Sequence, residues 1–168
     1  DLRAFYNYRR WFVREVGALV LIELVALLQD AQLAQAVDLA TEGYDCGSKF
    51  GCSELIRAVA PRLEAPLLEK AWKTLVQHPD PTSCPNLDKT METLADNFKT
   101  DAELEVAANA AFDVFRGSET FGAAAISALI PRLAESSNTK LHNLISCFAS
   151  GLCDPQGVDD IHAFASTL

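Results

Sequence analysis

Apolar residues recur along this chain at the spacing of one helix face. In the clearest run they fall at i, i+3, i+4, i+7, i+8 and i+11. This run comprises Leu104, Ala107, Ala108, Ala111, Phe112 and Phe115. Alternation of apolar and polar residues with a period of two is absent over any useful length. The pattern therefore predicts an all-α protein with almost no sheet.

The predicted helices come in pairs, and a short polar break joins the members of each pair. The pairs are residues 23–28 with 31–41, 54–63 with 67–77, 87–98 with 102–115, and 123–133 with 139–149. A fifth unit begins at Val158. Successive units start roughly 35 residues apart, which is the length of the helical hairpins that build α-solenoids.

A phrase that occurs twice supports this division. Residues 47–63 read GSKFGCSELIRAVAPRL, and residues 117–133 read GSETFGAAAISALIPRL. The prolines Pro61 and Pro131 lie 70 residues apart, which corresponds to two units. We therefore expect Phe-Gly and Pro-Arg-Leu to serve helix stacking and turns in both copies.

The unit at residues 117–151 resembles an armadillo/HEAT-type repeat. It contains a short first helix, a Gly-containing turn, a helix with an internal Pro, a Ser/Asn-rich break and a longer third helix. The resemblance extends over roughly residues 20–168. It implies a right-handed superhelix, or α-solenoid, of about four helical hairpins, which acts as a non-catalytic protein-binding scaffold or adaptor.

One feature of peptide-binding armadillo repeats is missing. Such repeats carry an Asn near the end of the third helix, where this chain has Gln77, Val114 and Cys147. The absence of a regular Asn ladder argues against clamping of an extended peptide backbone.

The N-terminal segment, residues 1–20, differs from the helical-repeat domain that we expect over residues 21–168. It is basic and aromatic, and Tyr8, Arg9, Arg10 and Trp11 form its centre. Either it is a helix that caps the open end of the stack, or it docks onto a partner. The second interpretation follows from the enrichment of Tyr, Trp and Arg at binding hot spots.

The most apolar run of the chain covers residues 16–28. Glu23 interrupts it, and it is shorter than the roughly 20 apolar residues that a membrane-spanning helix needs. We predict a buried helix there.

The net charge of −9 is unevenly distributed. Residues 1–20 carry +2, and the rest of the chain carries −11. An acidic body argues against nucleic-acid binding, which needs clustered Lys and Arg. It favours partner proteins with basic segments. Membrane contact is expected only through the N-terminal region.

The five cysteines include two pairs with the spacing C-x5-C, Cys46 with Cys52 and Cys147 with Cys153. Each pair spans a predicted junction between units. Two interpretations remain open: local disulfides, which imply an oxidising compartment, or reduced thiols in small buried sites. An intracellular location, cytoplasmic or organellar, is favoured over an oxidising compartment.

No residue pattern points to catalysis, a cofactor or a metal. The chain lacks G-x-S-x-G, G-x-G-x-x-G and P-loop motifs, its carboxylates are spread along helices, and its three histidines lie in different units. We predict that the protein is not an enzyme and holds no cofactor.

Helix phase selects candidate partner-binding residues on the second helices of the units. They are Asp38, Lys73, Asn109, Asp113, His142 and Asn143. Two other functions remain open. One is a peripheral subunit of a larger, membrane-bound or organellar complex, and the other is a disulfide-stapled helical carrier of a lipid or pigment with a closed apolar cavity.

Overall fold

The computed structural model describes the backbone of residues 2–78, 84–117 and 119–136, and of residues 138, 139, 142, 143 and 146. Within these ranges, side chains are described from Phe12 onwards, except those of residues 116–123. All regular secondary structure in this part of the chain is helical. The predicted all-α class is confirmed.

Short 3-10 turns extend the ends of the first and third helices. The elements are α1 (Leu2–Leu24), η1 (Val25–Leu27), α2 (Asp30–Asp45), α3 (Lys49–Val59), η2 (Ala60–Arg62), α4 (Ala65–Gln77), α5 (Leu87–Asn97), α6 (Asp101–Gly117) and α7 (Glu119–Glu135). The predicted hairpin breaks lie within two residues of the observed ones. The predicted boundary at residue 20 falls inside α1. The unit expected from Val158 lies outside the described residues.

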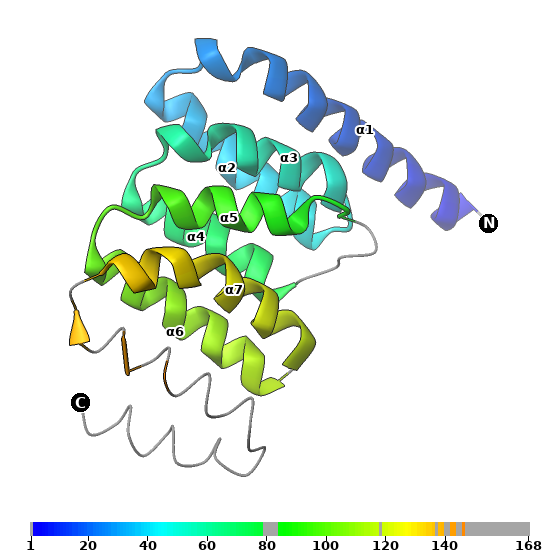
Figure 1. Cartoon of the computed structure of the whole chain (residues 1–168). Helices are drawn as coiled ribbons and strands as arrows, with labels where there is room; N and C mark the ends of the chain where they lie inside the picture. Colours follow the sequence, from blue (N-terminus) through cyan, green and yellow to red (C-terminus); the bar gives the residue numbers. More distant parts are fainter. Residues whose placement is uncertain are drawn as a thin grey trace.

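The helices form two layers, because each helix packs on the helix two places further along the chain. α1, α3, α5 and α7 follow one another in the first layer, and α2, α4 and α6 in the second (Figure 1). The strongest contacts between the layers join α2 to α3 and α6 to α7, which are consecutive helices that belong to successive predicted hairpins. The N-terminal half of α1 projects beyond the other helices of its layer (Figure 1).

The core lies between the two layers, and Trp72 on α4 is its largest fully buried side chain. The Trp72 ring meets the ring of Phe98 edge-on, with centroids 5.6 Å apart. Its Nε1–H donates to the carbonyl of Ala107 on α6 at 3.0 Å. This bond joins α4 to α6 and satisfies an indole N–H whose burial without a partner would be costly.

The first-layer helices end at equivalent positions that are 35 residues apart. Leu28, Leu63 and Phe98 each have extended backbone at these ends, and each donates its N–H to the carbonyl three residues earlier. Leu133 on α7 lies a further 35 residues along the chain. Leu63, Phe98 and Leu133 are buried. An apolar side chain thus enters the core where the chain turns into the second layer.

The arginines of the repeated Pro-Arg-Leu phrase bind the end of the preceding first-layer helix. Arg62 donates to the carbonyls of Val25 and Leu28 at 2.5 and 2.6 Å, and Arg132 donates to that of Phe98 at 2.8 Å. Carbonyls at a helix C-terminus lack intrahelical partners and carry the negative end of the helix dipole. A guanidinium therefore stabilises them, which confirms that this phrase serves stacking.

The Phe-Gly of the first copy lies where α1 crosses the start of α3. The buried Glu15 of α1 accepts a hydrogen bond from the Gly51 N–H at 2.6 Å. This N–H belongs to the first turn of α3, so the carboxylate also faces the positive end of the helix dipole. A Cβ on residue 51 would lie 3.0 Å from the Glu15 carbonyl oxygen. Glycine therefore permits the close approach of α1 to α3.

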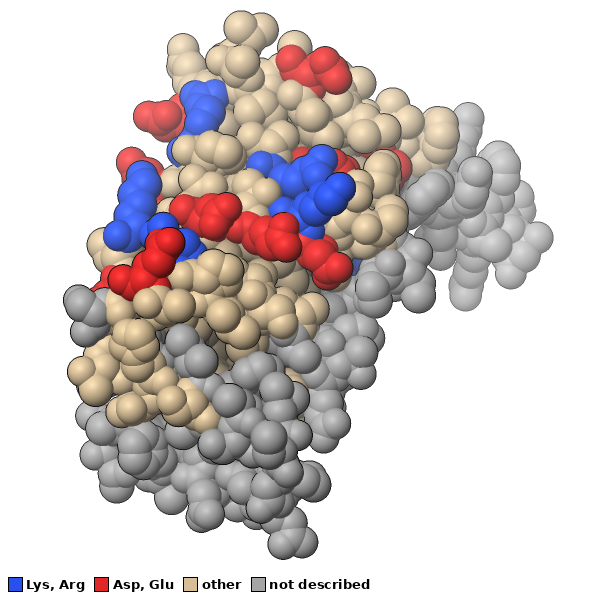
Figure 2. Space-filling model, in the orientation of Figure 1, with Lys and Arg blue, Asp and Glu red and all other residues tan. Residues whose placement is uncertain are grey.

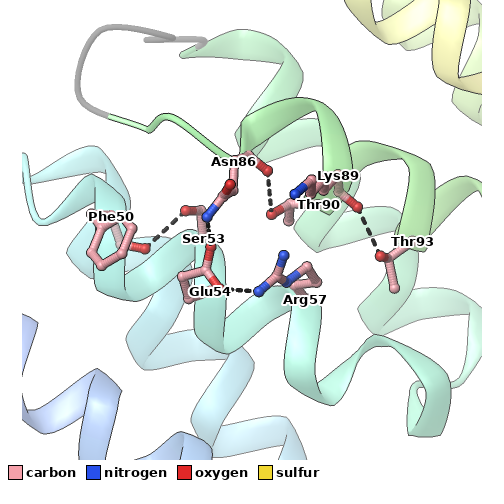
Figure 3. Close-up of polar contacts among 8 residues, drawn as sticks. All are labelled: Phe50, Ser53, Glu54, Arg57, Asn86, Lys89, Thr90 and Thr93. Carbon is pink, nitrogen blue, oxygen red and sulfur yellow. Dashed lines mark hydrogen bonds and ion pairs between the residues drawn. The ribbon is translucent and has the colours of Figure 1, made fainter.

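A polar seam joins α3 to the start of α5 (Figure 3). Glu54 on α3 pairs with Arg57 and accepts a hydrogen bond from Asn86 Nδ2 at 3.0 Å. Asn86 is the N-cap of α5, and its carbonyl accepts the Thr90 hydroxyl at 3.2 Å. The seam fixes where α5 begins after the 78–84 connection.

Replacing Gly51 with Ala tests the close approach of α1 to α3. The added methyl meets the Glu15 backbone, so we expect the free energy of unfolding to fall by about 1–3 kcal/mol despite the better helix propensity of Ala. Gly17→Ala on α1 is the matched control, because nothing lies within 4 Å of its added Cβ. It should be neutral or stabilising by up to ~1 kcal/mol in urea denaturation. Equal effects of the two substitutions would contradict the proposed role of Gly51.

Candidate interaction surface

Large apolar side chains are exposed along one helix far more than elsewhere. Seven lie on α1 and η1: Phe12, Val13, Val16, Leu19, Val20, Leu24 and Leu27. Among the other described residues only four join them, namely Leu39, Phe50, Val106 and Ile130. In Figure 2, charged side chains gather over α3 and α5, whereas the surface over α1 is largely uncharged. A contiguous apolar patch of this kind marks a site of interaction.

The prediction of a buried helix over residues 16–28 is wrong for the isolated chain. One face of α1 packs on α3 through Glu15 and Ala18, with Leu21 and Ile22 partly buried. α2 also contacts α1, across an open groove, and no further described helix lies beside it, because α1 is the first member of its layer. A helix that is apolar nearly all round is suited to burial on several sides. Here it is buried mainly on one.

An open groove runs between α1 and α2, with α3 as its floor. Its volume is about 510 Å³, and its lining is mainly apolar. The lining includes Val13, Gly17 and Val20 of α1, Leu39 and Gly43 of α2, and Leu55 of α3. Val13 is 67% exposed and Leu39 59%, so the groove opens to solvent.

Two charged side chains line the groove, one on each wall. Arg14 and Glu42 are among its lining residues. Residues 12–45 contain this one basic side chain against six carboxylates, and α2 itself carries four carboxylates and no Lys or Arg. The carboxylate of Asp38 pairs with Lys70 on α4 at 2.8 Å, on the side away from the groove. Glu42 is therefore the acidic side chain best placed to meet an occupant.

Cys52 is one of the residues that line the groove, and its thiol has low reactivity. Burial raises the pKa of its thiol to about 12, and the negative charge of Glu15 adds to this increase. The thiolate is the reactive form, so Cys52 is a poor nucleophile at neutral pH. The lining position and the raised pKa together favour a packing role.

The candidate disulfide between Cys46 and Cys52 is not formed in the structure. Cys46 and Cys52 both carry free thiols, Cys46 exposed and Cys52 buried. The other candidate pair, Cys147 and Cys153, lies outside the described residues.

A second hollow brings together three residues that helix phase selected. Lys73 on α4 and Asn109 and Asp113 on α6 line a depression of about 280 Å³. Lys73 also pairs with Glu69 at 2.5 Å. The residues share this surface because α4 and α6 are neighbours in the second layer.

The other selected residues lie elsewhere. Asp38 belongs to the ion pair with Lys70. His142 is exposed, and its Nε2 lies 2.7 Å from the Ser136 carbonyl oxygen, while Asn143 is half-buried. Neither is among the lining residues of the two hollows.

The basic aromatic cluster falls on the first half of α1. Tyr8, Arg9, Arg10 and Trp11 are helical, but their side chains lie outside the described part of the structure. The predicted choice between a capping and a docking role for them stays a prediction.

The groove residues Val13, Gly17, Val20 and Leu39 were not selected from the sequence. The signal that could have found them is the almost unbroken apolarity of residues 16–28, which exceeds what one packed face requires.

The described residues contain no group of three or more His, Cys, Asp or Glu side chains placed to hold a metal ion. None of their helices combines the length and apolarity that crossing a bilayer requires.

Comparison of the chain with family models, with curated proteins and with solved structures finds no significant match. The resemblance to armadillo/HEAT repeats therefore stays a prediction that depends on the residues themselves.

Alkylation at pH 8 tests the contrast between the thiols. We expect native Cys46 to react with iodoacetamide and Cys52 to react only after unfolding, because Cys52 is buried and stays protonated. Peptide mass spectrometry locates the label. A Cys46–Cys52 disulfide would instead leave both unlabelled until reduction.

The raised pKa of Cys52 also predicts that the stability of the protein depends on pH. The unfolded thiol loses its proton near its ordinary pKa of 9.0, and the folded one only near 12, so stability should fall as pH rises through this interval. In urea denaturation measured across this pH interval, Cys52→Ala should reduce the fall in the free energy of unfolding. An unchanged fall would contradict the raised pKa of Cys52.

Proposed function

We propose that this protein is a non-catalytic, protein-binding module of the α-solenoid class, and that it docks onto partner proteins through α1. The two-layer arrangement of hairpins supports an armadillo/HEAT-like right-handed superhelix, because that architecture stacks hairpins of about 35 residues. Layers of this kind offer extended surfaces, which suit protein partners better than small substrates.

The observation that carries the proposal is the exposed apolar face of α1. Its seven large apolar side chains lie in a continuous stretch, from Phe12 to Leu27, rather than scattered over the surface. Exposure of this kind costs free energy in water, and covering it on binding recovers that free energy. The acidic character of the chain favours basic segments on the partner.

A peripheral subunit of a larger complex uses the same surface. Such a subunit would bury α1 against its neighbours, and α1 would be the part least satisfied in the isolated chain. The carrier alternative has less support, because the apolar groove beside α1 is open and Cys46 and Cys52 are free thiols.

Substitution of the exposed face tests the docking role. A proteome-derived peptide library on phage is selected against the whole chain, and the dissociation constants of enriched peptides are measured by fluorescence anisotropy. Val13→Asp with Val20→Asp should weaken binding at least tenfold, because both side chains would carry charge into the interface. Both positions are more than half exposed, so the variant should remain folded by circular dichroism.

Ile130→Asp on α7 is the matched control, since it introduces the same charge at an exposed apolar position outside α1 and outside both hollows. It should leave the dissociation constant unchanged. Peptides that bind the α1 variant and the wild type equally would exclude α1 as the docking surface.

A further inference from the structure

The second layer has an open position next to α2. In that layer α4 lies between α2 and α6, whereas α2 has α4 on one side and no described helix on the other. The groove between α1 and α2 occupies this open position. Its walls are therefore the surfaces that a further second-layer helix would touch.

The walls are shaped for close approach of a helix. Gly17 lines the groove from α1, and a Cβ built on it meets nothing within 4 Å, so the space in front of it is empty. Val13 and Val20 flank Gly17 along the same wall, and Leu39 projects from the opposite wall. Small and apolar residues in this arrangement let a facing helix pack closely.

The charged residues on the groove walls indicate which kind of helix would bind there. On the α2 wall of the groove the charged lining residue is Glu42, and on the α1 wall it is Arg14, so the edge of a bound helix that faces α2 meets a negative charge. A helix with an acidic edge would meet repulsion there, and a helix with Lys or Arg along that edge would meet attraction.

We infer that the α1–α2 groove binds an amphipathic helix of a partner protein, with its apolar face on Val13, Gly17, Val20 and Leu39 and its basic edge against Glu42. The inference rests on the proposed function and specifies the partner. The bound helix would continue the second layer beyond α2, as α2 continues it beyond α4. At 1.5 Å per residue, about 14 residues would span roughly 21 Å, close to the length of α2.

Designed peptides supply the probe. One is a 14-residue peptide of Leu and Lys with Leu at helical spacing, a second replaces each Lys with Glu, and a third has the Leu–Lys composition without helical spacing. Binding to the whole chain is measured by fluorescence anisotropy at low and high salt. The helical Leu–Lys peptide should bind at least tenfold more tightly than either control, with salt weakening it.

Gly17→Leu is the decisive variant, because a Cβ on residue 17 meets nothing within 4 Å and the longer side chain would extend into the groove. Leu also favours helix more than Gly, so the variant should be at least as stable as the wild type. Binding should fall at least tenfold. Glu42→Lys should weaken binding severalfold and reduce its salt dependence. Ala102→Leu, at an exposed position on α6, is the matched control and should change neither.

Several outcomes would overturn the inference. Unchanged affinity in Gly17→Leu would place the peptide elsewhere on the acidic surface. Equal binding of the Glu peptide would refute the basic edge. Sedimentation velocity that shows a dimer lost in Gly17→Leu would assign the groove to a second copy of this chain. Binding to phosphatidylcholine vesicles that is lost in the same variant would assign it to lipid.

The two proposals can fail separately. If phage-selected peptides depend on Val13 and Val20 but bind Gly17→Leu normally, α1 is the docking surface and the groove is not. If neither set of peptides depends on α1, both proposals fail.

Discussion

The close packing of each helix on the helix two places along the chain is the constraint on which this structure depends. The Glu15–Gly51 hydrogen bond holds α1 on α3, and Arg62 and Arg132 tie successive first-layer helix ends together. Apart from the Val25 carbonyl, which also accepts the Leu28 N–H, these contacts use backbone groups that helix termini leave without intrahelical partners. Because the groups recur at every helix end, the same kind of bond can be made along the stack.

In a stack, neighbours within the layer cover an inner helix on two sides, whereas the first helix of the layer is covered on one side. α3 and α5 lie between neighbours in their layer, whereas α1 has one, yet α1 and η1 contain the most apolar run of the chain, residues 16–28. The composition of this part of α1 is therefore suited to burial on several sides, but its position in the stack buries it mainly on one. The exposed face and the groove beside α2 follow from that conflict, and binding of a partner would resolve it.

Part of the candidate site was accessible from the sequence. Helix phase placed Lys73, Asn109 and Asp113 on the second helices, and the structure joins them in one hollow, because adjacent second-layer helices present the same phase. The groove, by contrast, could not be predicted from the sequence. Its walls come from α1, α2 and α3, and the exposed side of α1 cannot be separated from its packed side when nearly every position is apolar.

The sequence by itself determined the helical class, the hairpin breaks and the roughly 35-residue period, since these follow from local propensity and from apolar spacing of 3–4 residues. It also indicated that Pro-Arg-Leu serves packing. Only the tertiary structure decided which carbonyls Arg62 and Arg132 bind and why Gly51 is glycine. It alone decided that residues 16–28 are largely exposed, because exposure depends on how many neighbours a helix has in space, and the spacing of residues within one helix carries no information about that number.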